Sequence, residues 1–438
     1  MADTIYSLSS GQARAGVALI RVSGPHAGMA IKALAGRVPA PRRASLCRLK
    51  RPATETTIDV ALVLWLPGPG SFTGEDTAEF HVHGGRAVVA ALLDALGSLG
   101  GLRPAEAGEF TRRAFINGRL DLVAVEGLAD LIAAETELQR RQAQFHSGGS
   151  ASAVFEAWRT EMIQLLARLE AAIDFVDEAG VAEAAICEVE PRLRRLLKAL
   201  QATLDDQHRG EIIRDGVRIV LAGPPNVGKS SLLNRLARRE AAIVSATPGT
   251  TRDVIEVPLD LAGIPVIISD TAGLRDGATD EIEAEGMART RATIARTDLL
   301  IWMSSPDVIS YPSPALDSEA LWIANKSDLG GGPPVADGAQ IQVSAKTGDN
   351  IELLVDRLSD WARRRFAGTE SSLITRERQR KAIEACCAHL EASAARNLPL
   401  ELVTEEVRLA ARALARLVGR IEVDDLLEAV FRDFCIGK

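Results

Sequence analysis

The chain has 438 residues, of which 47% are hydrophobic and 25% charged, a balance that is typical of a globular protein and excludes a largely disordered one. Its formal net charge of −8 excludes a protein that wraps nucleic acid unaided, so any contact with RNA must come from local patches or through a partner. No run of about 20 apolar residues predicts a membrane span, and five cysteines without C-x-x-C spacing favour a reducing, cytoplasmic location.

Four segments of different character follow one another along the chain. Residues 1–118 mix short β-type runs, at 17–22 and 59–66, with glycine- and proline-rich turns and a helical run at 87–99, which predicts an α+β domain. Residues 119–212 carry apolar side chains at helical spacing, for example Ile163, Leu166 and Leu169, which is typical of a helical bundle.

Residues 213–368 alternate short apolar runs with amphipathic helical stretches, and helical periodicity returns over 369–438. The alternation predicts an α/β domain with a mainly parallel sheet and helices on both faces. Its expected strands cover 217–222, 254–259, 266–269, 299–303, 321–324 and 341–343. The arrangement indicates a discontinuous helical bundle, split by an inserted α/β domain.

A phosphate-binding motif opens the α/β segment. Residues 223–230 read G-P-P-N-V-G-K-S, between an expected strand and an expected helix, which is the context in which backbone N–H groups wrap phosphate oxygens. Lys229 is expected to reach the β- and γ-phosphates, and Ser230 is expected to bind Mg²⁺. The nucleotide contacts expected here come from Asn226, Val227, Gly228, Lys229, Ser230 and Ser231.

Three further motifs follow strands of the same domain. Residues 270–273 read D-T-A-G. Asp270 is expected to hold Mg²⁺ through water, and the N–H of Gly273 is expected to sense the γ-phosphate. The base site is expected at Asn325, Lys326 and Asp328, and at Ser344, Ala345 and Lys346. A carboxylate at Asp328 accepts both the N1–H and the N2–H₂ of guanine, a donor pair that adenine lacks, so the nucleotide is expected to be GTP or GDP.

The residue that positions the attacking water is not obvious. Ras-like GTPases use a glutamine just after the D-x-x-G motif, but the chain has Leu274 there, and an isobutyl group cannot orient water. Charged residues that follow or precede this position are alternatives: Arg252, Asp253, Arg275, Glu281, Glu283 and Glu285.

Seven segments together resemble the MnmE (TrmE) family of tRNA-modification GTPases. They are residues 249–253 (G-T-T-R-D), 270–275 (D-T-A-G-L-R), 434–438 (F-C-I-G-K), 18–25, 71–76, 83–85 and 108–115. The resemblance covers the whole chain. It implies an N-terminal folate-binding and dimerising domain (1–118), a discontinuous helical domain (119–212 and 369–438) and an inserted Ras-like P-loop GTPase domain (213–368).

The resemblance also implies an activity and its partners. The expected protein is a cytoplasmic homodimer that hydrolyses GTP. With the flavoprotein MnmG (GidA), which carries FAD, it would form a heterotetramer that modifies carbon 5 of the wobble uridine of certain tRNAs with aminomethyl or carboxymethylaminomethyl groups. The one-carbon unit is expected from 5-formyltetrahydrofolate or methylenetetrahydrofolate.

Site residues carried over from the family complete the expectations. K⁺ would bind Asn226, Ser245, Thr247 and Thr250, in a loop that also brings Ala246, Pro248 and Gly249 to the nucleotide, and Thr251 would join Ser230 on Mg²⁺. Glu283 would position the water, with Glu281 as its rival, beside Lys229 and Asp270 as catalytic groups. Folate would bind Arg21, Glu79, Arg119 and Lys438.

Two other readings compete with this one. A ribosome-assembly GTPase would act as a binding switch on rRNA, but the segment after residue 366 is helical and not strongly basic. A folate-binding scaffold with a regulatory GTPase is the third class.

Overall fold

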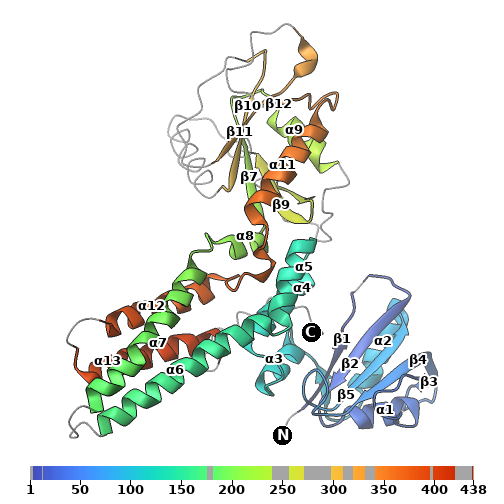
Figure 1. Ribbon diagram of the computed structural model, residues 1–438. Helices are drawn as coiled ribbons and strands as arrows, with labels where there is room; N and C mark the ends of the chain where they lie inside the picture. Colours follow the sequence, from blue (N-terminus) through green and yellow to red (C-terminus); the bar gives the residue numbers. More distant parts are fainter. Residues whose placement is uncertain are drawn as a thin grey trace, which may run out of the picture. The chain divides into compact units, whose positions relative to one another are not determined.

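The computed structural model describes residues 3–11, 13–174, 181–238, 256–270, 297–308, 319–330, 341–394, 398–419 and 437. The chain forms two compact units, and both are discontinuous in sequence. The first unit holds Met1–Ala129, His146–Leu196 and Ala385–Lys438, and the second holds Asp130–Phe145 and Leu197–Glu384. Figure 1 labels most of the helices and strands of each unit.

The first unit contains a six-stranded sheet in the order β3-β4-β5-β2-β1-β6, with β1 and β6 parallel and the other described pairs antiparallel. Its strands are β1 (Thr4–Leu8), β2 (Val17–Ser23), β3 (Ser45–Lys50), β4 (Thr57–Leu66), β5 (Thr77–His83) and β6 (Leu102–Pro104). Helices α1 (Ala27–Ala35) and α2 (Arg86–Gly97) share one hydrophobic core with the alternate residues Ala18, Ile20 and Val22 of β2. The strand predicted at 17–22 is therefore confirmed, and one of its faces is buried in this core.

The opposite face of this sheet carries exposed apolar side chains. Leu46 and Leu62 are paired across β3 and β4 and are 67% and 44% exposed, and Val17 and Val60 are 57% and 42% exposed. We call this surface the open face. The edge strands β3 and β6 bound it, and they carry Arg48 and Pro104 respectively.

Long helices make up the rest of the first unit and continue into the second. They are α3 (Glu109–Ile116), α4 (Leu122–Ala133), α5 (Glu137–Ser147), α6 (Ser150–Asp174), α7 (Val181–Leu204), α12 (Glu377–Ser393) and α13 (Leu400–Leu417). Helices α6 and α13 pack together, with Phe155 and Leu165 buried on one and Val407 and Leu414 on the other. This pairing confirms that helical segments before and after the α/β domain belong to one discontinuous bundle.

The second unit contains a six-stranded sheet in the order β12-β11-β10-β7-β9-β8, in which the β8–β9 pair is antiparallel and the other described pairs are parallel. Its strands are β7 (Val217–Ala222), β8 (Glu256–Leu261), β9 (Ile264–Asp270), β10 (Leu299–Ser304), β11 (Ala320–Ala324) and β12 (Ile341–Gln342). The helical elements are α8 (Arg209–Asp215), α9 (Lys229–Ala237), α11 (Ile351–Phe366), η2 (Ser327–Leu329) and η3 (Thr369–Ser371). The predicted mainly parallel sheet is confirmed, and its core joins β7, α9 and α11 through Ile219, Leu232 and Leu354.

None of the helices in the described ranges combines the length and the apolar character that crossing a membrane requires.

Candidate functional site

The phosphate-binding motif forms a tight loop between β7 and α9. Gly223 has φ +145, and a Cβ atom there would lie 2.3 Å from the carbonyl oxygen of Met303 on β10. Gly228 has φ +94, and its Cβ would lie 2.3 Å from Nδ2 of Asn325. Only glycine fits at either position, because the backbone conformation and the neighbouring atoms both exclude a side chain. The loop is thus held against β10 and against the segment after β11.

Lys229 begins α9 and is buried within this loop. Its Nζ donates to the carbonyl oxygens of Gly223 and Pro224, each at 3.1 Å. The ammonium group is therefore held against the loop that leads into α9. Its positive charge and the N-terminus of the helix both favour the binding of phosphate oxygens here.

A hydroxyl and a carboxylate meet beside the loop. Ser230 Oγ donates to Oδ2 of Asp270 at 2.6 Å. Asp270 ends β9, and the parallel register places it opposite Leu221 at the end of β7. Hydroxyl and carboxylate oxygens are ligands that Mg²⁺ prefers. The two residues predicted for Mg²⁺ from different motifs are therefore in contact.

Asn325 links the phosphate loop to the predicted base site. Its Nδ2 donates to the carbonyl oxygen of Val227 at 2.8 Å, and its Oδ1 accepts from the N–H of Ala345 at 3.0 Å. One buried amide thus holds together three of the predicted motifs, at residues 223–230, 325–328 and 344–346.

Asp328 lies next to Asn325 in the predicted base site and has an ionised carboxylate. Ser344 Oγ donates to its Oδ1 at 2.6 Å, and this hydrogen bond lowers the pKa of Asp328. Lys326 has φ +62, and its Nζ lies 2.7 Å from Oδ2 of Asp307. A charged acceptor at Asp328 is the group that a guanine ring needs.

Part of the predicted nucleotide and catalytic set lies outside the described residues. This part comprises Ser245, Ala246, Thr247, Pro248, Gly249, Thr250, Thr251, Thr271, Ala272, Gly273, Glu281 and Glu283.

A second constellation lies on the open face of the sheet in the first unit. Arg21 and Glu79 are directly opposite on β2 and β5, and Nε and Nη2 of the arginine donate to Oε1 of the glutamate at 3.1 and 2.9 Å. The Arg21 guanidinium lies 5.4 Å from the ring centroid of Phe72 and 5.9 Å from that of Phe110. Two of the four predicted folate residues are therefore paired, with two aromatic rings close to the cation.

The other two predicted folate residues, Arg119 and Lys438, are located by the contacts of Gly74 and Gly437. A Cβ built on Gly74 would lie 3.3 Å from Cγ of Arg119, so Arg119 packs on the turn that carries Phe72. Lys438 lies outside the described residues, but the carbonyl oxygen of Gly437 accepts from Ser9 Oγ at 2.7 Å, just beyond β1. Ser7 of β1 is paired with Arg21, so Gly437 is held just beyond the strand that lies beside Arg21.

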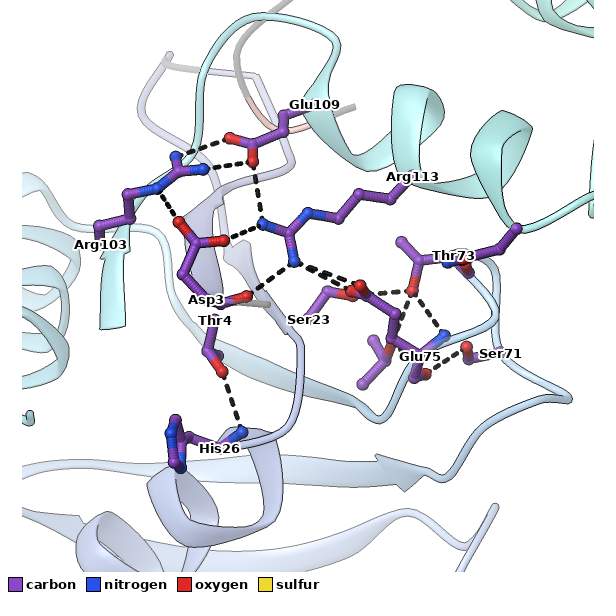
Figure 2. A network of polar contacts seen from close by, with 12 residues as sticks. Asp3, Thr4, Ser23, His26, Ser71, Thr73, Glu75, Arg103, Glu109 and Arg113 are labelled. Atoms are coloured by element: carbon purple, nitrogen blue, oxygen red, sulfur yellow. Dashed lines mark hydrogen bonds and ion pairs between the residues drawn. The ribbon is translucent and has the colours of Figure 1, made fainter. Parts of the chain in front are cut away.

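A network of five charged residues borders this constellation, and it was not predicted from the sequence (Figure 2). Nη1 and Nη2 of Arg103 donate to Glu109 at 2.8 and 2.6 Å, and its Nε donates to Asp3. Arg113 donates to Asp3 Oδ1 at 2.8 Å, to Glu109 Oε1 at 2.9 Å and to Glu75 Oε2 at 3.1 Å. The spacing of Glu109 and Arg113 on one helix was a local signal, whereas Asp3 and Glu75 are distant in sequence from both.

The network keeps its carboxylates ionised. The hydrogen bond from Arg103 is the main cause that lowers the pKa of Asp3. Burial by itself raises the pKa of Glu109, but the hydrogen bonds from Arg103, the Glu106 N–H and Arg113 outweigh it, so the pKa is lowered.

Comparison with known proteins gives the family. Residues 4–119 match the family described as GTP-binding protein TrmE N-terminus, and residues 122–435 match the MnmE helical domain. The tRNA modification GTPase MnmE of Methylobacterium sp. (strain 4-46) is 51% identical, with 100% of both chains covered. Those of Parvibaculum lavamentivorans and Rhodospirillum rubrum are 51% and 50% identical, over 100% of this chain and 100% and 99% of theirs. The chain belongs to the MnmE family. As a member of this family it is a tRNA modification GTPase.

Two solved structures resemble part of the chain. Era in complex with MgGDPNP and nucleotides 1506–1542 of 16S ribosomal RNA is 23% identical, with a TM-score of 0.27 over 33% of this chain and 56% of Era. The G domain of the T. maritima FeoB transporter is 21% identical, with a TM-score of 0.24 over 33% of this chain and 98% of that domain.

Proposed function

We propose that this MnmE-family GTPase depends on K⁺ and, with the flavoprotein MnmG (GidA), modifies carbon 5 of the wobble uridine of certain tRNAs, with a one-carbon unit from a tetrahydrofolate derivative. The observation that carries the proposal is that Lys229, the Ser230–Asp270 pair and Asp328 lie at the carboxyl ends of strands of one sheet. In a parallel sheet this edge is where ligands bind.

The bound nucleotide is GTP, and its phosphates lie along the loop of Asn226, Val227 and Gly228 and the start of α9. Ser230 and Thr251 bind Mg²⁺ and Asp270 holds the ion through water, and the ion offsets phosphate charge when it is bound. The 2.6 Å contact between hydroxyl and carboxylate supports this assignment, because both are oxygen ligands. Asp328 accepts from the guanine N–H groups while Asn325 keeps the base site fixed to the phosphate loop.

K⁺ binds at Asn226 and at Ser245, Thr247 and Thr250, and supplies positive charge beside the phosphates. Asn226 supports this assignment because it stands in the phosphate loop at φ +64 and offers an amide oxygen, a ligand that suits a hard cation. Glu283 orients the attacking water, since Leu274 cannot do so. Glu281 is the alternative for this role.

The first unit binds 5-formyltetrahydrofolate or methylenetetrahydrofolate at Arg21, Glu79, Arg119 and Lys438. Basic side chains suit the anionic glutamate tail of a folate. The rings of Phe72 and Phe110 beside Arg21 support a site for a flat heterocycle. FAD belongs to the MnmG partner and not to this chain.

Two copies associate through the N-terminal domain and join MnmG as a heterotetramer that works on tRNA. The exposed apolar side chains of the open face support the homodimer, because a cluster of this kind marks an association surface. We divide the chain into residues 1–118, 119–212, 213–368 and 369–438, the second and fourth forming one helical domain.

The decisive experiment compares modified nucleosides in total tRNA from cells that lack the gene and carry either an empty vector, the parent gene or Ser230→Ala. The parent restores the modified wobble uridine, and the empty vector and Ser230→Ala do not. Unchanged nucleosides in all strains, together with altered ribosomal subunit profiles, would instead favour a ribosome-assembly switch.

A further inference from the structure

We propose that Arg113 and Glu75 are positioning residues for the folate site: their ion pair holds the turn at residues 71–77 so that Phe72 stays against Arg21. This inference rests on the proposed folate site. Neither residue contacts Arg21 or Glu79 through any described hydrogen bond, so both act through the turn.

The turn is tied to β2 close to Arg21. Ser23, two residues after Arg21, donates to Glu75 Oε2 at 2.8 Å and shares a 2.7 Å hydrogen bond with Thr73. The N–H of Glu75 also donates to Thr73 Oγ1 at 3.2 Å. Ser23 and Thr73 are fully buried, so water does not reach these hydrogen bonds. Phe72 of the same turn lies beside Arg21.

Helix α3 holds the same turn from the other side at two points. Nη1 of Arg113 lies 3.1 and 3.3 Å from the two carboxylate oxygens of Glu75, and Nδ2 of Asn117 donates to the carbonyl oxygen of Thr73 at 2.7 Å. Phe110, three residues before Arg113, is the second ring beside Arg21 and packs in one cluster with Phe72. One helix therefore supplies one ring directly and fixes the other through the turn.

Arg113 can serve this purpose because it is fixed itself. Its Nη2 donates to Asp3 and Glu109 (Figure 2), and its side chain is only 12% exposed. Without Arg113, the Glu75 carboxylate keeps, among its described contacts, only the hydrogen bond from Ser23. It then draws the turn toward water, because a charge that is partly buried must find other partners.

Arg103 provides a matched control within the same network. It binds Asp3 and Glu109 as Arg113 does, but none of its described contacts reaches the turn. Arg112 on α3 is exposed and serves as a surface control.

The test measures the affinity of the full-length protein for 5-formyltetrahydrofolate by calorimetry, with the melting temperature and GTP affinity of each variant. Arg113→Gln and Glu75→Ala are expected to raise the folate Kd by about tenfold to a hundredfold, the range seen when supporting groups around a site are removed. The double variant is no worse than either single one, because both remove one ion pair. Glu75→Gln, which keeps an acceptor, recovers part of the affinity, and GTP affinity stays unchanged in all.

Arg103→Gln lowers the melting temperature but leaves the folate Kd unchanged. A parent-like Kd for Arg113→Gln, or an equal loss in Arg103→Gln, would overturn the inference and leave only a stabilising network. Arg21→Ala separates this outcome from failure of the proposed function: if Arg21→Ala also binds folate normally, the folate site itself is wrong.

Discussion

The carboxylate of Asp328 faces the place where a guanine base is proposed to bind, and its charge is maintained by Ser344. Asp328→Asn replaces one acceptor by a donor and is expected to lower GTP affinity on the order of a hundredfold while raising xanthosine triphosphate affinity, because xanthine offers the complementary acceptor. Equilibrium binding of fluorescent nucleotides measures both. Asp356→Asn, on the exposed side of α11, is the control; GTP binding by Asp328→Asn as tight as that of the parent would contradict the assignment.

A comparison of Gly228 with Gly368 distinguishes the effect of backbone strain from the effect of a close contact. Gly228→Ala brings both a left-handed φ and a Cβ that meets Asn325, so the bridge between phosphate loop and base site must shift. We expect GTP affinity to fall by at least about tenfold. Gly368→Ala has a similar φ of +79 with open space around its Cβ, so it pays the strain alone and should leave GTP affinity near that of the parent. Equal losses in the two variants would refute the role of the Asn325 bridge.

Glu283 and K⁺ are tested together by single-turnover hydrolysis. Rates should be high in KCl and low in NaCl at equal ionic strength, since Na⁺ is smaller and fits a ring of oxygen ligands poorly. Glu283→Ala should lose on the order of 10²–10⁴ in rate with GTP affinity kept, because a carboxylate that orients water does not touch the nucleotide. Equal rates in both salts would remove the potassium claim, and a slow Glu281→Ala beside an active Glu283→Ala would move the role to Glu281.

At the scale of elements, helix α8 precedes the first strand of the parallel sheet and contacts the segment that follows the sheet, at residues 374–380. Arg380 of α12, whose side chain is 7% exposed, binds Asp206 Oδ1 at 2.7 Å and Glu211 Oε2 at 2.9 Å. A Cβ at Gly210 would lie 2.1 Å from the carbonyl oxygen of Ile374, so α8 and this segment are in close contact.

Arg380→Ala should therefore lower the free energy of unfolding of the second unit by about 3 kcal/mol, because it leaves two carboxylates without their buried partner. Lys381→Ala, the next residue on α12, removes an exposed ion pair with Glu377 and should have little effect. Urea denaturation followed by circular dichroism compares them. Indistinguishable midpoints would show that the Arg380 cluster does not contribute to stability.

The strands that could be predicted are those that carry a motif or a long apolar run. The expected strand at 217–222 is observed with the same bounds as β7, and the expected 254–259 is described as Glu256–Leu261. Strands β1, β3 and β6 were not predicted individually. On β3 the apolar Leu46 is exposed like Arg48, so hydrophobic and polar residues do not alternate, and β6 has only three residues. Such strands are defined by their pairing with distant segments and not by local propensity.

The same distinction applies to the sites. Ser230 and Asp270 could be paired in advance because each stands at the end of a strand in a parallel sheet, where the topology brings strand ends together. The network of Asp3, Glu75 and Arg113 joins three segments whose adjacency follows only from the tertiary fold. No spacing rule in the sequence relates them.

At the scale of the whole molecule, the charged network makes stability depend on pH. Asp3 and Glu109 have lowered pKa values in the folded chain, so their ion pairs stabilise the fold above the ordinary carboxyl pKa of about 4 and are lost as pH falls through the lowered values. The melting temperature should hold from neutral pH to about pH 5 and decrease below about pH 4.

Arg103→Gln should lower the melting temperature at neutral pH and make the acid decrease shallower, because less of the pKa shift remains to be lost. Arg112→Gln should keep the parent slope. Scanning calorimetry at a series of pH values distinguishes them, and an unchanged slope in Arg103→Gln would show that the acid sensitivity arises elsewhere.

The edges of the sheet in the first unit decide how copies of this chain can stack in solution. A free edge exposes a row of N–H and C=O groups to which another strand can add, the route to fibre-like aggregates. At one edge, β3 carries the positive charge of Arg48, so two copies of this edge repel each other. At the other edge, β6 is only three residues long and ends at Pro104, which has no N–H to donate. Growth by strand addition is therefore blocked on both sides, so two copies can approach face to face while an unlimited ribbon cannot form.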